Sequence, residues 1–240
     1  MRACLSVCAA LALITFADAD VCRATPPAGR WPGFERGIGM GGWLTNYKRF
    51  NVLRNDWRMK LTEGDFEHFE TFITERDVAY VAKCGFDHIR LGFDQIVLEE
   101  SPGKYRERTF RCVDNFVGWC RKHGLGVVLN LHKAIGNYCD IPGGPSLMDE
   151  KDLQDRFVAL WLEFERHYHD DRALAFELLN EVNSTDCEKW NALAERTVKA
   201  IRAVNAERTI VVGSCGGNYP QFLDRLRVFD DPHVVYTFHW

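Results

Sequence analysis

The residues best suited to chemistry are an amide and a carboxylic acid that follow a buried strand directly. Residues 173–182 read ALAFELLNEV, an apolar run that ends on Asn180 and Glu181. Both side chains need hydrogen-bond partners or water, and burying either one unpaired costs several kcal/mol. In an active site the pair has a use, because the carboxyl can exchange protons with a substrate while the amide holds it. The alternative is a strand that simply enters a solvated loop.

Three further polar side chains lie at the ends of other apolar runs, namely Arg90, His132 and His239. Polar tips on four separate strands are what a barrel with its site at the carboxyl ends of its strands would show. Each also has a structural alternative. Arg90 can form an ion pair with Asp94 or with a helix acid, and the histidines can be core residues or metal ligands. Metal-dependent hydrolase barrels often carry an HxH pair on the first strand, where Gly37–Leu44 has no histidine, so we expect no metal.

The elements that position these residues alternate between apolar strands and amphipathic helices. Six strands are predicted, at Gly37–Leu44, Phe86–Phe93, Gly126–His132, Ala173–Asn180, Thr209–Gly213 and His233–His239. Helical stripes separate them, the clearest from Leu153 to Tyr168. Thr185 with Glu188 predicts a capping box ahead of another. Such alternation predicts an α/β fold with a parallel sheet covered by helices.

That sheet can be a (β/α) barrel or a doubly wound sheet, and the motifs favour the barrel. Gly37–Gly42 reads GIGMGG, which lacks the GxGxxG spacing of a dinucleotide site, and no GxxxxGK(S/T) phosphate loop occurs. We therefore expect no nucleotide or other cofactor. The chain has 240 residues, 46% of them apolar, which is ordinary globular composition. Its net charge of −4 gives no reason to bind nucleic acid or an anionic membrane, and we expect a monomer.

The N-terminal segment has a different character from the rest of the chain. Arg2 is followed by ACLSVCAALALITFA, an apolar stretch too short to cross a bilayer comfortably. Ala17-Asp18-Ala19 then has the small-x-small pattern of a signal-peptidase site. We predict a signal peptide over 1–19, one domain over 20–240, and a secreted protein, extracellular or periplasmic. The alternatives are a buried N-terminal element and a wrongly assigned gene start.

Seven cysteines would remain after that cleavage. They are Cys22, Cys84, Cys112, Cys120, Cys139, Cys187 and Cys215. An oxidising compartment permits disulfides. Their spacing contains no CxxC pair, so neither a zinc site nor a thioredoxin-like motif is indicated. The pairing stays open, and an odd number leaves at least one thiol unpaired.

The motifs, taken in order, resemble the signatures of glycoside hydrolase family 5. They are GMGGWL at Gly39–Leu44, HIRLGFD at His88–Asp94, VVLNLHKAIGNY at Val127–Tyr138, LLNEV at Leu178–Val182 and VVYTFHW at Val234–Trp240. Asn-Glu alone also occurs in related barrel families, whereas the ordered set is more specific. The resemblance implies a (β/α)8 TIM barrel of retaining hydrolases acting on β-linked polysaccharides or oligosaccharides. About the first six β/α units would lie in this chain.

The resemblance also implies a role for each polar tip. Glu181 would be the acid/base, and Asn180 would hydrogen-bond the 2-hydroxyl of the reacting sugar. Arg90 would keep the nucleophilic carboxylate ionised and oriented, which suits a side chain that cannot lose its charge. His132 and His239 would line the floor of the same subsite.

Two aromatic residues near strand ends, Trp43 and Trp240, are predicted to stack on sugar faces. A further position departs from the pattern of the family, which often has Asp where this chain has Asn130. That position lies one step inside its strand, so we expect a modest effect on the site.

A retaining glycosidase needs a second carboxyl about 5 Å from the first. The family places this nucleophile at the tip of the seventh strand, and the sequence shows six strands. Asp230 and Asp231 precede the sixth strand and so would lie at the wrong end. We therefore expect no nucleophile here, an inactive 240-residue chain with an open barrel, and a truncated record of a longer gene. The alternatives are a non-catalytic carbohydrate-binding pseudoenzyme and a metal-dependent barrel hydrolase. Endo or exo action, and glucan or mannan as substrate, stay open.

Overall fold

The computed structural model describes residues 33–45, 60–137 and 144–240. The chain divides into two units, Met1–Trp31 and Pro32–Trp240, and the described residues all belong to the second. The predicted signal peptide lies outside the described residues, as do Cys22 and Cys139. No helix within the described part is long and apolar enough to cross a membrane.

Six parallel strands form one sheet in the order in which they occur in the sequence. They are β1 (Gly37–Met40), β2 (His88–Asp94), β5 (Gly126–Lys133), β6 (Leu174–Glu177), β7 (Thr209–Gly213) and β8 (Val234–Thr237). A doubly wound sheet reverses its strand order at a switch point, whereas a TIM barrel adds each strand beside the previous one. The barrel prediction, with six β/α units in this chain, is confirmed.

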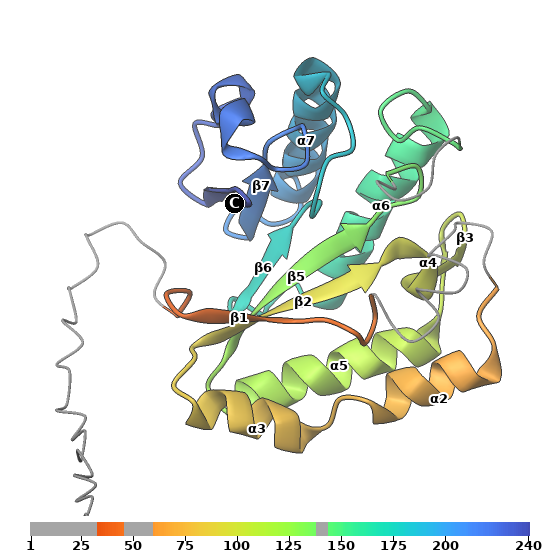
Figure 1. The fold of residues 1–240 in the computed structure, drawn as a ribbon, viewed down its shortest axis with the longest axis vertical. Coiled ribbons are helices and arrows are strands. Elements are labelled where there is room, and N and C mark those ends of the chain that lie inside the picture. Colours follow the sequence, from red (N-terminus) through yellow and green to blue (C-terminus); the bar gives the residue numbers. More distant parts are fainter. Residues whose placement is uncertain (1–32, 46–59, 138–143) are drawn as a thin grey trace, which may run out of the picture. The chain divides into compact units, whose positions relative to one another are not determined.

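Helices cover one face of this sheet. They are α2 (Glu63–Thr71), α3 (Glu75–Lys83), α5 (Glu107–Lys122), α6 (Lys151–His167) and α7 (Cys187–Arg202). Figure 1 shows α3 beside α5 and α6 beside α7. Shorter elements are α4 (Gln95–Leu98), the hairpin β3 (Glu99–Ser101) with β4 (Lys104–Tyr105), and the 3-10 helix η1 (Pro220–Arg225).

The core lies between the strands and these helices. Ile89, Leu91 and Phe93 alternate along β2 and are fully buried, and the ring of Phe93 lies 5.0 Å from that of Phe164 on α6. Side chains alternate between the two faces of a strand, so Arg90 points to the opposite, inner face. The outer face of the sheet therefore packs against the helices in the core, whereas the inner face carries the polar side chains of Arg90, Asn130 and Glu177 together with some apolar ones.

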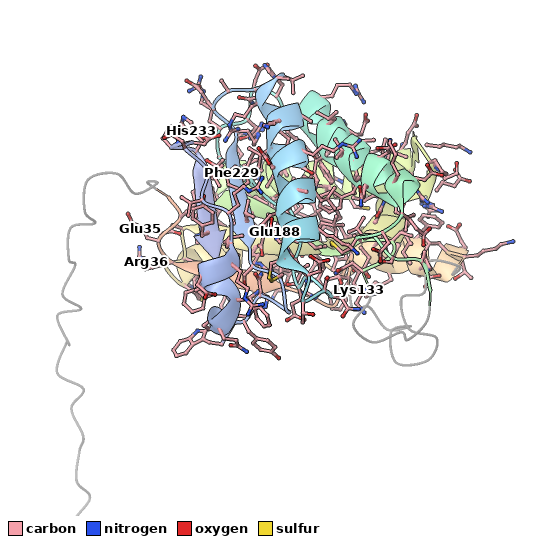
Figure 2. The ribbon with its side chains drawn as sticks, turned by 90° about the horizontal axis from the view of Figure 1, so that it is seen from above. Glu35, Arg36, Lys133, Glu188, Phe229 and His233 are labelled. Carbon is pink, nitrogen blue, oxygen red and sulfur yellow. A yellow bond between two sulfur atoms is a disulfide. The ribbon has the colours of Figure 1, made fainter. Side chains whose placement is uncertain are left out.

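Parallel strands bring their carboxyl ends to one side. Figure 2 shows His233, which precedes β8, and Lys133, the last residue of β5, at opposite ends of the sheet. The loops that leave the carboxyl ends of neighbouring strands are therefore adjacent in space.

One helix start differs from the prediction. Helix α7 is capped by Asp186, whose carboxylate accepts a hydrogen bond from the backbone N–H of Lys189 at 3.4 Å. The predicted capping box of Thr185 and Glu188 is therefore wrong. Asp186 is an equally suitable capping residue one position later, and the sequence spacing alone did not separate the two.

Candidate active site

Arg90, on the inner face of the sheet, donates hydrogen bonds to two other residues of the candidate site. Arg90 donates from Nε to Oε2 of Glu177 at 2.6 Å and from Nη2 to Oε1 of the same carboxylate at 2.8 Å. Its Nη2 also donates to Oδ1 of Asn180 at 2.7 Å. The suggested ion pair with Asp94 is wrong, since the carboxylate that Arg90 pairs with is that of Glu177. Arg90 therefore fixes the orientation of the amide beside Glu181.

Glu177 is a site residue that the sequence analysis missed. It pairs in register with Asn130 on β5, lies on the inner face and is 2% exposed. A carboxylate buried within an apolar strand needs a cation opposite it, and that requirement was the available signal. What the sequence did not indicate is that the cation is Arg90, 87 positions earlier.

The predicted acid/base lies just beyond β6 and faces solvent. The side chain of Glu181 is 45% exposed, and its Oε1 lies 3.1 Å from Nδ1 of His239. The backbone N–H of His239 donates to the carbonyl of Asn218 at 2.8 Å. The structure thus brings Glu181 and His239 together, and Asn180 and Arg90 together.

His132 lies on the inner face at the carboxyl end of β5, where its Nδ1 is 3.0 Å from Oδ1 of Asn130. Burial lowers the pKa of His132 to about 4, and the positive charges of Arg90, Lys133 and His239 act in the same direction. The imidazole is therefore neutral near pH 7. An amide oxygen can only accept, so Nδ1 carries the proton and Nε2 remains an acceptor for a hydroxyl group.

The two predicted stacking residues differ in exposure. Trp43 is 1% exposed, its indole N–H donates to the carbonyl of Phe69 at 2.7 Å, and its ring packs 5.5 Å from that of Phe116. A buried indole offers no face to a sugar, so the stacking role expected of Trp43 is corrected to a core role. Trp240 is fully exposed next to His239, and its role stays a prediction.

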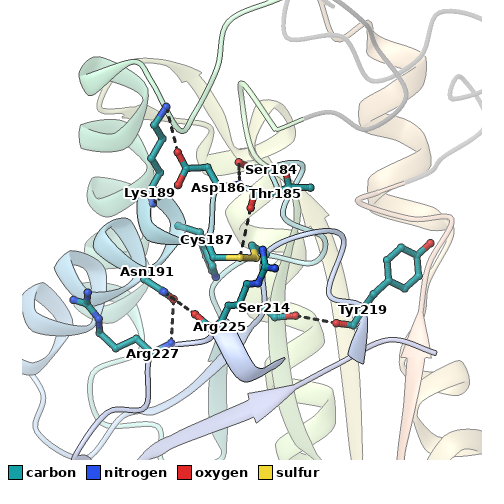
Figure 3. The surroundings of a disulfide bond; sticks show 12 residues. Ser184, Thr185, Asp186, Cys187, Lys189, Asn191, Ser214, Tyr219, Arg225 and Arg227 are labelled. Carbon is teal, nitrogen blue, oxygen red and sulfur yellow. Dashed lines mark hydrogen bonds and ion pairs between the residues drawn. A yellow bond between two sulfur atoms is a disulfide. The ribbon is translucent and has the colours of Figure 1, made fainter. Parts of the chain in front are cut away.

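A disulfide joins the start of α7 to the loop after β7. Cys187, the first residue of α7, is bonded to Cys215 in the loop after β7, with 5.2 Å between the two Cα atoms (Figure 3). Among the described residues, Cys84, Cys112 and Cys120 are free thiols. Within the same ranges, no group of three or more His, Cys, Asp and Glu side chains could hold a metal ion.

Comparisons with known proteins find similar sequences over most of this chain. The model of the family "Cellulase (glycosyl hydrolase family 5)" matches residues 48–240. Endoglucanase C of Acetivibrio thermocellus is 37% identical over 210 residues, which cover 86% of this chain and 57% of the relative. Cellodextrinase A of Ruminococcus flavefaciens is 34% identical over 213 residues, with 86% and 58% covered. The chain thus spans less than two thirds of the length of these relatives.

Solved structures give the same result for the fold. Endoglucanase Cel5A of Thermotoga maritima superposes with a TM-score of 0.67 at 28% identity, covering 87% of this chain and 60% of that one. The same enzyme has been solved with cellobiose and, at the same TM-score and identity, with mannotriose.

Proposed function

The chain belongs to the cellulase family, glycosyl hydrolase family 5, and on that premise we propose that it is part of a retaining β-glucanase. The observation that carries the proposal is the pair at the end of β6. Glu181 presents a carboxylate to solvent next to His239, while the preceding Asn180 is oriented by Arg90. A proton donor beside a fixed amide is the arrangement that cleavage of a glycosidic bond requires.

In this mechanism Glu181 protonates the departing glycosidic oxygen and later activates the water that releases the sugar. Asn180 has its Oδ1 occupied by Arg90, which leaves its Nδ2 to donate to the 2-hydroxyl group. Hydrogen bonds to that hydroxyl strengthen in the transition state. His132 and His239 line the subsite, and the free Nε2 of His132 accepts from a second hydroxyl. Trp240 stacks on a sugar face.

Arg90 is suited to hold the second carboxylate as well. Its Nη1 has no acceptor among the described residues, and its side chain is 30% exposed. Glu177 is not that nucleophile, since it is 2% exposed and both its oxygens accept from Arg90. We place the nucleophile on a glutamate at the tip of a seventh strand, as the family pattern implies.

The proposed substrate is a β-linked glucan or oligosaccharide, bound by a secreted monomer that carries a signal peptide over residues 1–19. No metal, cofactor, nucleic acid or membrane takes part. Because one relative named above is an endoglucanase and another a cellodextrinase, polymeric β-glucan and cello-oligosaccharides both serve as test substrates. Because Cel5A was solved with mannotriose as well as cellobiose, mannan is the comparison substrate.

The test compares two proteins, these 240 residues and the same chain extended through a seventh strand with its glutamate. Only the extended protein should release sugar from barley β-glucan or carboxymethylcellulose. Glu181→Ala should lower its rate on the order of 10²–10⁴-fold. Azide, a nucleophile that needs no general base, should restore turnover of an activated aryl cellobioside. If Glu181→Ala retains full activity on β-glucan, Glu181 is not the acid/base.

A carbohydrate-binding pseudoenzyme is the second candidate. Its supporting observation is that Arg90, Asn180 and His132 provide sugar-binding groups without a second accessible carboxylate beside them in the described ranges. Calorimetry with cello-oligosaccharides separates the two. Binding without any product, in a protein that contains the complete seventh strand, favours the pseudoenzyme.

A further inference from the structure

We infer that Asn137 and Asn218 are positioning residues for the carboxylate of Glu181, because they hold the peptide groups on both sides of it. Asn137 lies in the loop after β5 and Asn218 in the loop after β7, while Glu181 follows β6. The acid therefore lies between two asparagines that come from the strands on either side. The inference rests on the proposed function, since it concerns how the proposed acid/base is held.

Asn137 bonds the segment at two points. Its Nδ2 donates to the carbonyl of Glu181 at 2.6 Å, and its Oδ1 accepts from the backbone N–H of Asn183 at 2.8 Å. The side-chain amide thus bonds the segment as a neighbouring strand would, one residue on either side of Val182. Asn137 is 4% exposed, so water does not compete effectively for these bonds.

Asn218 holds the other side. Its Nδ2 donates to the carbonyl of Asn180 at 2.7 Å, and its own carbonyl accepts from the backbone of His239. Asn218 has a φ of 66°, a left-handed conformation that asparagine tolerates better than most residues. The Oδ1 atom of Asn218 lies 1.9 Å from the position that a Cβ on residue 213 would occupy. Glycine at position 213 therefore leaves the space that the side chain of Asn218 fills.

The two asparagines matter because they bond the peptide groups on both sides of Glu181, in a segment whose backbone is also anchored by the N–H of Asn180 on the carbonyl of Leu131 at 2.9 Å. The carbonyls of Asn180, Glu181 and Val182 accept from Asn218, Asn137 and the backbone of Gly217 in turn. The carboxylate itself is 45% exposed, and among the described residues it contacts the side chain of His239 alone. With the backbone held, only the side-chain torsions of Glu181 are free. A shift of about 1 Å in a catalytic group can cost on the order of 10²-fold in rate.

Asn191 provides a matched control from the same protein. It is 3% exposed, its Nδ2 donates to the carbonyl of Arg225 at 2.9 Å, and its Oδ1 accepts from the backbone N–H of Arg227 at 3.1 Å (Figure 3). This amide therefore bonds a chain segment in the same two-point manner as Asn137. The segment it holds, beyond η1, does not include Glu181. Asn191→Ala should lower the free energy of unfolding as much as Asn137→Ala does. Unlike Asn137→Ala, it should not affect the segment around Glu181.

The first measurement uses the 240-residue chain and hydrogen exchange of the amides of residues 180–184. Asn137→Ala should raise their exchange rate on the order of tenfold, which corresponds to about 1.4 kcal/mol, whereas Asn191→Ala should leave it unchanged. Asn137→Asp and Asn218→Gly are the second variants. Asn137→Asp keeps an oxygen that can accept from the N–H of Asn183 and removes the donor to the carbonyl of Glu181. Asn218→Gly removes the side chain and keeps the left-handed backbone conformation at residue 218. Equal exchange in the Asn137 and Asn191 variants would overturn the inference.

The second measurement uses the extended, active protein and two substrates. Cellotetraose needs protonation of its leaving group, whereas 2,4-dinitrophenyl β-cellobioside does not. Asn137→Ala and Asn218→Gly should lower kcat/KM for cellotetraose on the order of ten- to a hundredfold and for the aryl glycoside less than about threefold. Asn191→Ala should lower neither. Glu181→Gln, measured beside them, tests the proposed function separately. If Glu181→Gln lowers kcat/KM for cellotetraose more than for the aryl glycoside and the asparagine variants do not, the positioning role is overturned. If Glu181→Gln lowers both values equally, the proposed function fails.

Discussion

The two ends of strand β6 are held by arginine–glutamate pairs of the same composition. Arg208 pairs with Glu165 at the amino end, where its Nε lies 2.7 Å from Oε2, and Arg90 pairs with Glu177 at the carboxyl end, with 2.6 Å between the same atoms. Both glutamates are almost fully buried. The pairs differ in what the guanidinium does with its remaining donors.

At the amino end the remaining donors are saturated. Arg208 also donates from Nη1 to the carbonyls of Asp171 and Leu174 and from Nη2 to that of Tyr168, and its side chain is 1% exposed. Arg90 is 30% exposed and keeps Nη1 without an acceptor among the described residues. A buried ion pair alone therefore does not indicate a function. Of the two pairs, the one in the proposed site is the pair whose guanidinium keeps a donor without an acceptor among the described residues.

The largest expected effect is at the saturated pair. Glu165→Gln should lower the free energy of unfolding by about 3–5 kcal/mol, because Arg208 would keep a charge in a fully buried position without its counter-charge. Urea unfolding followed by tryptophan fluorescence measures the change. A loss below about 1 kcal/mol would mean that the backbone carbonyls suffice to hold Arg208, and the contrast between the two ends would be lost.

Beyond the carboxyl end of β6, a disulfide between Cys187 and Cys215 provides a covalent link that the amino end lacks among the described residues. The bridge closes a loop of 28 residues, and removing it should cost about 2–4 kcal/mol. The double variant Cys187→Ala with Cys215→Ala is compared in urea with the parent chain, both oxidised and reduced. The reduced parent and the variant should unfold at the same lower urea concentration. If the oxidised parent unfolds there too, the disulfide does not stabilise this end.

The fold could be predicted because its signals are local. Six apolar runs separated by helical stripes define the strand order, and polar residues at their ends define the edge where the site lies. Arg90, Asn180, Glu181 and His239 were recognised by that rule and lie in contacting pairs. The role of each in catalysis stays a prediction.

The rest depends on contacts between distant segments. Glu177 belongs to the site through a partner two strands away, and an acid inside an apolar strand does not name its cation. Trp43 was assigned to the sugar by residue type, but only the packing of α2 and α5 decides that its indole is buried. Asn137 lies within the motif at Val127–Tyr138, but neither its hydrogen bonds to residues 181 and 183 nor that of Asn218 to residue 180 follow from residue type or spacing.

Glu177→Gln is the matched counterpart of the Glu165 variant, and its effect on stability should be smaller. We expect a loss of about 1–2 kcal/mol, because Arg90 is 30% exposed and water can solvate its charge. The same urea titration measures it. The larger consequence should be a loss of activity. Without the carboxylate of Glu177, Arg90 is no longer held in the orientation in which it donates to Oδ1 of Asn180. A stability loss equal to that of Glu165→Gln would show that both pairs are structural.

The smallest expected effect concerns the charge that Arg90 presents to the site. His132 has a pKa of about 4, set first by burial and then by the charge of Arg90. The double variant Arg90→Gln with Glu177→Gln removes that charge without leaving an unpaired acid. The pKa of His132 should then rise by less than about one unit, or about 1.4 kcal/mol, because burial remains.

The lowered pKa of His132 also determines how the free energy of unfolding changes with pH. Unfolded histidine titrates near pH 6.5 and folded His132 near pH 4. The unfolded chain therefore binds the proton first, and stability falls as the pH drops between these values. In the double variant this loss should be smaller, because the folded pKa is higher. Histidine NMR titration measures the pKa directly, with Glu165→Gln as the control that should leave it unchanged. An unchanged pKa in the double variant would mean that Glu177 already neutralises Arg90, and the two ends of β6 would then be electrostatically alike.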